Sequence, residues 1–207
     1  MPFPFDAGLL QHIISDTDHP APPDDDQFAA TSVFMLVFNK AHTPCLLTVL
    51  KADNQGYPWR NQVALPGGHV DESDNSSLMA AYRETQEELH ITPEQIELVG
   101  SLGHFQTIQQ KDIEVFLGVW QGSENDIHFD SNEIARVLTP PIPLLLKRHL
   151  EQQFAGRIPG VGELIYPIDN LVIWGVTARI VHYFLELIRI RLPADSVDTL
   201  LAAAGPI

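Results

Sequence analysis

Three glutamates lie within five residues of one another near the middle of the 207-residue chain. Glu84, Glu87 and Glu88 belong to the run RETQEE, which begins at Arg83. In a helix, residues three and four apart lie on one face, so the three carboxylates would project together. Hard cations such as Mg²⁺ and Mn²⁺ bind carboxylate oxygens and take phosphate oxygens as further ligands. The spacing therefore indicates a divalent metal site or a solvated helix face, and the solvated face is commoner for an isolated cluster.

A glycine pair precedes this cluster. Gly67 and Gly68 end a short apolar segment, and two aspartates, Asp71 and Asp74, follow in a polar loop. Because glycine has no Cβ atom, its backbone can approach a metal ion or a phosphate closely. The glycine pair and the acidic loop together favour the metal site over the solvated face.

A helix must carry the glutamates. Ser76 or Ser77 can cap its N-terminus, and the pattern predicts that it runs to about Leu89. Four positions recur at helical spacing and would face the core. These positions are Leu78, Tyr82, Thr85 and Leu89.

Strands and helices are predicted on both sides of this helix. Apolar patterns predict strands over residues 32–38, 45–50, 62–65, 96–99 and 113–120. Further helices are predicted over residues 7–14, 143–152 and from 172 or 173 to 191. This order of elements indicates an α+β fold, an α/β/α sandwich around a mixed β-sheet.

One catalytic domain is the economical organisation for a chain of this length, which is 44% hydrophobic. We expect it to span residues 29–192. Residues 1–28, which contain a Pro/Asp-rich connector, would form an N-terminal extension, and residues 193–207 a C-terminal tail.

The charge balance limits the partners. Twelve basic and 27 acidic residues give a formal charge of −15, which argues against a nucleic-acid surface. An acidic protein can bind phosphorylated substrates through divalent cations, although surplus acid can equally serve solubility alone.

The remaining composition points to a cytoplasmic protein. Cys45 has no partner cysteine in the chain and lies in an apolar run, so we expect a buried thiol. The N-terminus has neither a basic stretch nor a long apolar run, as a signal peptide would. Charged residues interrupt the apolar stretch 171–190, which is typical of a packed amphipathic helix and not of a membrane span.

The catalytic segment resembles a known family motif. From Gly68 to Ile91 the sequence is similar to the Nudix box, GX5EX7REUXEEXGU. Asp74 stands at the first Glu position, eight residues instead of seven separate it from Arg83, and His90 replaces a glycine. The form PGGxxDxxD, the longer spacer and RETxEE resemble the coenzyme A pyrophosphatase branch of the family. Similarity to that branch extends over about residues 33–190.

The chain departs from this branch upstream of the box. After Leu46-Leu47-Thr48 the branch carries an arginine, where Val49 and Leu50 stand here. Its His-x-Gly becomes Trp59-Arg60-Asn61, and the preceding loop, residues 51–57, is about two residues longer. These departures concern the recognition of coenzyme A, and Lys51 or Arg60 could supply the missing basic group.

The resemblance implies roles for the acidic residues. Glu84 and Glu88 would be direct ligands of Mg²⁺ or Mn²⁺, with the Gly68 carbonyl as a third. Glu87 would bind a second metal ion or orient the attacking water, and Arg83 would hold the glutamates in place.

The resemblance leaves the general base open, because the loop before residue 134 is similar to the loop that supplies a glutamate in family members. Glu87 and Glu133 are therefore alternatives for the base. Trp59, in a polar loop, is expected to meet the ligand, together with Arg60 and Lys51. Trp174 is expected in the core, as the start of an apolar helix, and His104 as a histidine with its hydrogen bonds satisfied.

The resulting expectation is a metal-dependent pyrophosphohydrolase. Coenzyme A or an acyl-CoA, cleaved to 3′,5′-ADP and a phosphopantetheine product, is the first-choice substrate. Another nucleoside diphosphate derivative, such as ADP-ribose or a dinucleotide, is the alternative, followed by a catalytically idle ligand-binding domain. No nucleic-acid or membrane partner is expected, and a homodimer is a further hypothesis.

Overall fold

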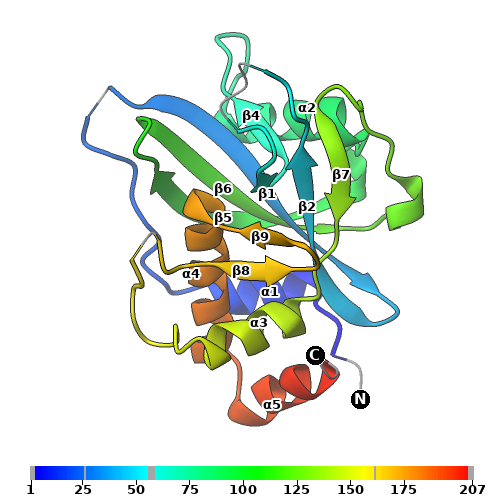
Figure 1. Cartoon of the computed structure of the whole chain (residues 1–207), viewed down its shortest axis with the longest axis vertical. Helices are drawn as coiled ribbons and strands as arrows, with labels where there is room; N and C mark the ends of the chain where they lie inside the picture. Colours follow the sequence, from blue (N-terminus) through cyan, green and yellow to red (C-terminus); the bar gives the residue numbers. More distant parts are fainter. Residues whose placement is uncertain (1–2, 26, 56–58, 161, 205–207) are drawn as a thin grey trace.

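The computed structural model describes residues 3–25, 27–55, 59–160 and 162–204 (Figure 1). Residues 56–58, in the loop that was expected to be longer than in the coenzyme A branch, lie outside the described residues. The described residues form two sheets, one of seven strands and one of two. The strands are β1 Ala29–Lys40, β2 Thr43–Lys51, β3 Val63–Ala64, β4 Gly67–His69, β5 Ile96–Gln106, β6 Lys111–Trp120, β7 Ile134–Leu138, β8 Tyr166–Ile168 and β9 Leu171–Ile173.

Five α-helices accompany these strands in the described residues. They are α1 Ala7–Ile14, α2 Ser77–Leu89, α3 Ile142–Glu151, α4 Gly175–Arg191 and α5 Ala194–Ala203. Two single turns of 3₁₀ helix, Pro93–Gln95 and Glu124–Asp126, precede β5 and β7. None of the described helices is both long and apolar enough to cross a membrane.

The large sheet is mixed. Its strands follow the order β3-β2-β1-β6-β5, with β4 paired to β1 and β7 to β2. β1 and β6 run parallel, with Val33 opposite Val115, whereas the other pairs are antiparallel. Because side chains alternate along a strand, β1 supplies both faces of the sheet.

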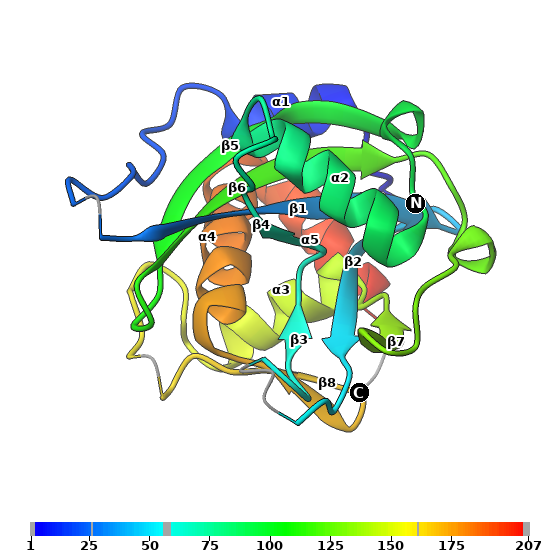
Figure 2. The ribbon, with the colours of Figure 1, turned by 90° about the horizontal axis from the view of Figure 1, so that it is seen from above.

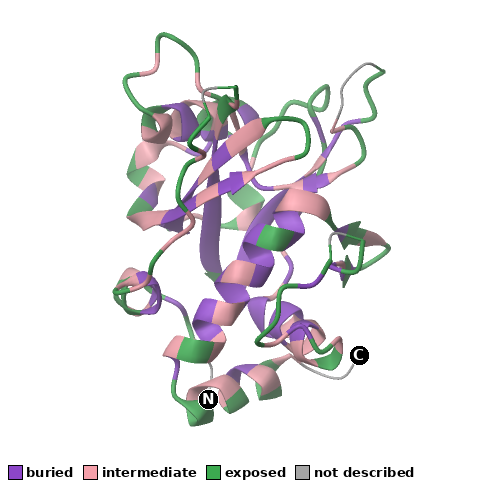
Figure 3. Ribbon diagram, turned by 90° about the vertical axis from the view of Figure 1, so that its left-hand side faces the viewer, coloured by how far each residue is buried: buried purple, intermediate pink, exposed green. Residues whose placement is uncertain are grey.

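Helices cover both faces. Phe34, Leu36 and Phe38 of β1 pack in the cluster that contains Ala81 and Leu89 of α2. The alternate residues, such as Val33 and Met35, belong to the cluster that includes buried residues of α1, α3 and α4. Figure 2 shows α2 and α4 on opposite sides of the sheet, and Figure 3 shows buried positions along the strands between them. The predicted α/β/α sandwich around a mixed sheet is confirmed.

The helix that carries the glutamates has the predicted bounds, Ser77–Leu89. Ser76 caps it by accepting a hydrogen bond from the Met79 N–H. His90 ends it in the left-handed conformation, with φ 54°, which accounts for the glycine usual at this position. Thr85 and Leu89 are buried as expected.

The structure corrects the start of α4. The helix begins at Gly175, and residues 171–173, expected at its first turn, form β9 with β8. Gly175 adopts φ +64°, which favours glycine and marks the change from strand to helix. β5 is also longer than expected and reaches Gln106.

Both terminal segments pack on the domain. Leu10, Ile13 and Ile14 of α1 and Leu200 of α5 belong to the core cluster on the α4 face. α5 lies in the segment that was expected to be a tail and was not predicted from its sequence.

Candidate active site

The carboxylates of Glu84 and Glu88 lie against the glycine pair. The Gly67 N–H donates to Oε2 of Glu88 at 3.1 Å, and Glu88 is only 3% exposed. A Cβ atom on Gly68 would lie 2.5 Å from the carboxyl carbon of Glu84. A Cβ atom on Gly67 would lie 2.6 Å from Cα of Val33. The two glycines therefore allow β4 to pass between β1 and the acidic face of α2.

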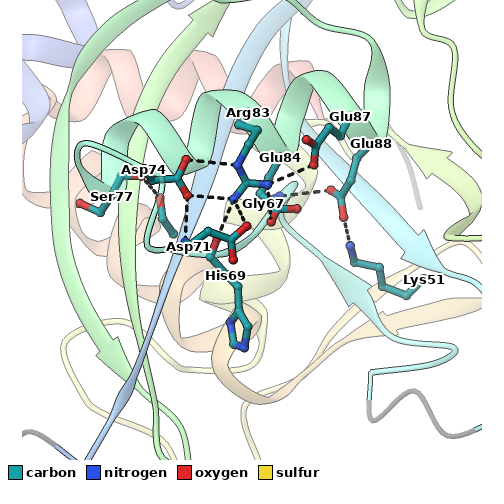
Figure 4. A network of polar contacts seen from close by, with 11 residues as sticks. Lys51, Gly67, His69, Asp71, Asp74, Ser77, Arg83, Glu84, Glu87 and Glu88 are labelled. Atoms are coloured by element: carbon teal, nitrogen blue, oxygen red, sulfur yellow. Dashed lines mark hydrogen bonds and ion pairs between the residues drawn. The ribbon is translucent and has the colours of Figure 1, made fainter.

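Arg83 organises the acidic residues around it (Figure 4). Its Nε and Nη2 donate to the two oxygens of Asp74 at 3.1 and 2.9 Å. Its Nη1 donates to Glu84 and Glu87, both at 3.1 Å. Nη2 also donates to the carbonyl of His69 at 3.0 Å. Arg83 thus links the loop before α2, the strand β4 and two glutamates, and the planar guanidinium suits this arrangement.

Burial disfavours the charged forms of Glu84 and Glu88, the two inner glutamates. Burial raises the pKa of Glu84, with Glu88 and Glu87 adding to the rise and Arg83 opposing it. Burial also raises the pKa of Glu88, against the opposing effects of Lys51 and the Gly67 N–H. Two partly desolvated carboxylates on one helix face favour a nearby positive charge.

Lys51 supplies such a charge. It lies at the end of β2, is 5% exposed, and its Nζ forms an ion pair with Oε1 of Glu88. The pairing of β2 with β7 is irregular at this point, because Leu50 pairs with Arg136 and Lys51 with Ile134. Lys51 was predicted to contact substrate, and this remains a prediction; its ammonium contacts Glu88, a predicted metal ligand.

The oxygen atoms at this site supply some of the ligands that a hard divalent cation takes. Within the described ranges, no three or more His, Cys, Asp or Glu side chains are gathered closely enough to hold a metal ion. Glu84 and Glu88, with the Gly68 carbonyl beside them, could supply three oxygen ligands. Mg²⁺ keeps several waters and takes substrate phosphate oxygens when few protein ligands are present, so this smaller set suits it.

A cavity of about 780 Å³ adjoins these residues. Its floor is the α4 face of the sheet, including Val33 and Ile113, and α4 contributes its first two turns. The predicted site residues that line it are Lys51, Trp59, Gly68, Glu84, Glu88 and Glu133. The sheet thus brings together residues that are up to 82 positions apart, from Lys51 to Glu133.

Three predicted site residues lie outside this lining. The Glu87 side chain is 59% exposed and paired with Arg83, which is also outside. Arg60 is 53% exposed in its side chain and lies 3.7 Å from Asp53. The geometry therefore separates Glu133, which faces the cavity, from Glu87, which does not.

The cavity also contains residues that were not predicted to be in the site. Trp174, expected in the core, is 46% exposed and lines the cavity, because it precedes α4 instead of lying within it. Lys111 and Arg179 line it as well. The segment 173–180, which contains both Trp174 and Arg179, was a usable signal, whereas Lys111 has no local sequence feature that marks it. His104 is hydrogen bonded to Asp112 at 2.8 Å, as a satisfied histidine should be.

Comparisons with known proteins agree on one family. The family model described as the NUDIX domain matches residues 29–157. A Citrobacter koseri protein named "Uncharacterized Nudix hydrolase NudL" is 30% identical over 162 residues, covering 77% of this chain and 83% of its own. The NudL of Photorhabdus laumondii is 26% identical over 179 residues, with 83% and 92% covered. The solved structure of RenU, a Nudix hydrolase from M. smegmatis, aligns with a TM-score of 0.53 at 12% identity, covering 84% of this chain and 94% of its own, which concerns the fold alone.

Proposed function

The chain belongs to the NUDIX domain family and is a Nudix hydrolase. We propose that it cleaves the diphosphate bond of a nucleotide-derived small molecule. The observation that carries this proposal is the position of Glu84 against Gly68 and of Glu88 against Gly67, at the wall of a cavity of about 780 Å³. Bound at these residues, Mg²⁺ or Mn²⁺ would neutralise charge on the diphosphate oxygens and promote ionisation of a water.

The protein's own residues orient the reaction. Arg83 fixes the Glu84 carboxylate through Nη1 and the loop through Asp74, so it acts as a positioning residue. We assign the general base to Glu133, because it lines the cavity whereas Glu87 is held outside by Arg83. Glu133 would accept a proton from the attacking water as the new P–O bond forms and the bridging P–O bond breaks.

Coenzyme A or an acyl-CoA is the substrate that we propose first. The cavity is large enough for a nucleotide derivative, and its walls combine the carboxylates with apolar residues such as Val63, Leu65 and Ile113. Trp59 and Trp174 also line it and could stack on a planar group. ADP-ribose or a dinucleotide is the alternative, because stacking on an adenine ring would serve those substrates equally.

The hydrolase mechanism is tested by the substitution Glu88→Gln. We expect a loss of kcat on the order of 100-fold or more in the presence of Mg²⁺, because the substitution removes one of the two inner carboxylates. Glu97→Gln, on the exposed edge of β5, makes the same change of charge away from the cavity and should retain activity. Wild-type turnover by Glu88→Gln would refute the mechanism.

The substrate is tested with a panel of coenzyme A, ADP-ribose, NADH and diadenosine polyphosphates at fixed Mg²⁺ concentration. We expect the highest kcat/KM for coenzyme A. Turnover of another compound without any turnover of coenzyme A would refute the first choice and leave the diphosphate hydrolase in place.

A further inference from the structure

Lys111 and Arg179 differ from most cations of this chain. The protein has twelve basic residues against 27 acidic ones, and most of the described cations pair with a carboxylate. In the described part of the chain, the polar side-chain contacts of Lys111 and Arg179 are with an imidazole and a backbone carbonyl, and not with a carboxylate. Lys111 Nζ donates to Nε2 of His69 at 3.1 Å, and Arg179 Nη1 donates to the carbonyl of Gln106 at 2.7 Å. No carboxylate among the described residues therefore pairs with either charge.

The two residues belong to one structural unit. The hairpin between β5 and β6 connects Gln106 to Lys111, and Thr107 exchanges hydrogen bonds with Lys111 at 2.9 and 3.1 Å. Arg179, from the second turn of α4, attaches to the same hairpin through Gln106. Both side chains line the cavity, although the two residues are 68 positions apart in the sequence.

This unit is joined to the catalytic helix through His69. The His69 imidazole accepts from Lys111, while its backbone carbonyl accepts from Arg83. The cavity lining therefore includes two carboxylates, Glu84 and Glu88, and two cations from other elements, Lys111 and Arg179. A diphosphate bound through a cation at Glu84 and Glu88 would leave Lys111 and Arg179 for another part of the substrate.

The surroundings of Lys111 and Arg179 suit an anion. Lys111 and Ile113 face the cavity, whereas the intervening Asp112 binds His104 and Gln106. The first turn of α4 contains no acidic residue, and Trp174 provides no side-chain cap. A guanidinium and an ammonium that face one cavity form a strong recognition site for a phosphate group.

We propose that Lys111 and Arg179 form a specificity subsite for a phosphomonoester that the substrate carries apart from its diphosphate. The inference rests on the proposed diphosphate hydrolysis and refines it. It predicts that the enzyme distinguishes a nucleotide with an extra ribose phosphate from the same nucleotide without it.

The test compares coenzyme A with 3′-dephospho-coenzyme A in the wild type and in Lys111→Ala and Arg179→Ala. Each substitution should raise KM for coenzyme A by about tenfold, because it removes one charge-assisted contact with phosphate. The KM for the dephosphorylated compound should stay within about twofold, and kcat should change little for both. Arg136→Ala removes a cation outside the cavity and should affect neither substrate.

Binding of 3′,5′-ADP and of 5′-AMP, measured by calorimetry without turnover, separates this subsite from the catalytic proposal. Tighter binding of 3′,5′-ADP that is lost in Arg179→Ala would support the subsite even if coenzyme A were not hydrolysed. Equal binding of the two nucleotides by the wild type, or equal losses for both in the variants, would overturn it. An inactive wild type that binds them differently would count against the proposed function alone.

Discussion

Nζ of Lys51 forms an ion pair with Oε1 of Glu88, the most buried carboxylate of the candidate site. This ion pair joins the end of β2 to α2. The other oxygen of Glu88 accepts the Gly67 N–H. Both oxygens of this glutamate are therefore engaged before a cation arrives. A metal ion at Glu88 must share the carboxylate with Lys51 or displace it.

Lys51→Ala should therefore lower the stability of the metal-free protein and increase its response to metal. Removal of one partner of a buried ion pair costs about 3–5 kcal/mol, because the other charge remains desolvated. We expect a lower Tm in EDTA and a larger rise of Tm on addition of Mn²⁺ than the wild type shows. An unchanged Tm in EDTA, or an identical Mn²⁺ response, would contradict this competition for Glu88.

Arg83→Ala should reduce kcat strongly, although the Arg83 side chain is partly exposed. The substitution removes the hydrogen bonds to Asp74, Glu84, Glu87 and the His69 carbonyl. Groups that orient metal ligands typically contribute about 10–100-fold to activity or metal affinity, and we expect a loss of kcat in this range. The apparent Mg²⁺ affinity should fall as well, measured from activity against Mg²⁺ concentration.

Arg83→Lys distinguishes the geometry of the guanidinium from its charge. An ammonium cannot reach Asp74 and Glu84 in the same fork, so this variant should recover little of the loss. Full recovery would show that the positive charge alone suffices and that Arg83 does not position the glutamates.

Gly68→Ala tests the close approach of β4 to α2. The added Cβ atom would lie 2.5 Å from the Glu84 carboxyl carbon, so the carboxylate must move. We expect kcat to fall by about tenfold or more, since small displacements of catalytic groups are costly, with little change of Tm. Gly160→Ala is the matched control, because its Cβ atom would meet no described atom within 4 Å. Equal activity of the two variants would contradict the prediction.

Local signals explain which parts of the site could be predicted from the sequence. The cap at Ser76, the stripe that ends at Leu89 and the acidic cluster all lie within α2, and each depends on neighbours along the chain. The helix was therefore predicted with its observed bounds, and the metal ligands were proposed from the same segment.

The features of the site that were not predicted depend on contacts between distant segments. Trp174 was assigned to the core because residues 171–173 continue the apolar run of α4, but those residues pair with β8. Lys51 follows Leu47 and Val49 on the α2 face of β2, but strand periodicity does not show that Glu88 of α2 lies against this position. Arg179 reaches the cavity only because α4 packs near the hairpin that precedes Lys111.

Buried polar contacts between α3 and α4 should make the stability of the fold decrease in acid. His149 is fully buried, with Nδ1 2.9 Å from the Tyr166 hydroxyl and Nε2 2.8 Å from Glu186. The His182 ring lies 5.0 Å from that of His149, and its Nδ1 has no hydrogen-bond partner among the described residues. Burial lowers the pKa of both histidines. Burial also opposes the ionisation of Glu186, but Arg189, His149 and the Gly156 N–H outweigh it and lower its pKa to about 2.

All these shifts have the same consequence for stability. The unfolded chain binds protons to the histidines below about pH 6.5 and to Glu186 below about pH 4.5, before the folded protein does. Stability from the histidines is thus complete above pH 6.5 and decreases as the pH falls, and that from Glu186 is lost on further acidification toward pH 2. We expect the Tm of the wild type to fall between pH 7.5 and 5, measured by calorimetry. In His182→Leu the decrease should be smaller, because one buried histidine no longer titrates. A wild-type Tm that is constant over this range, or equal slopes in wild type and His182→Leu, would contradict the role of the buried histidines.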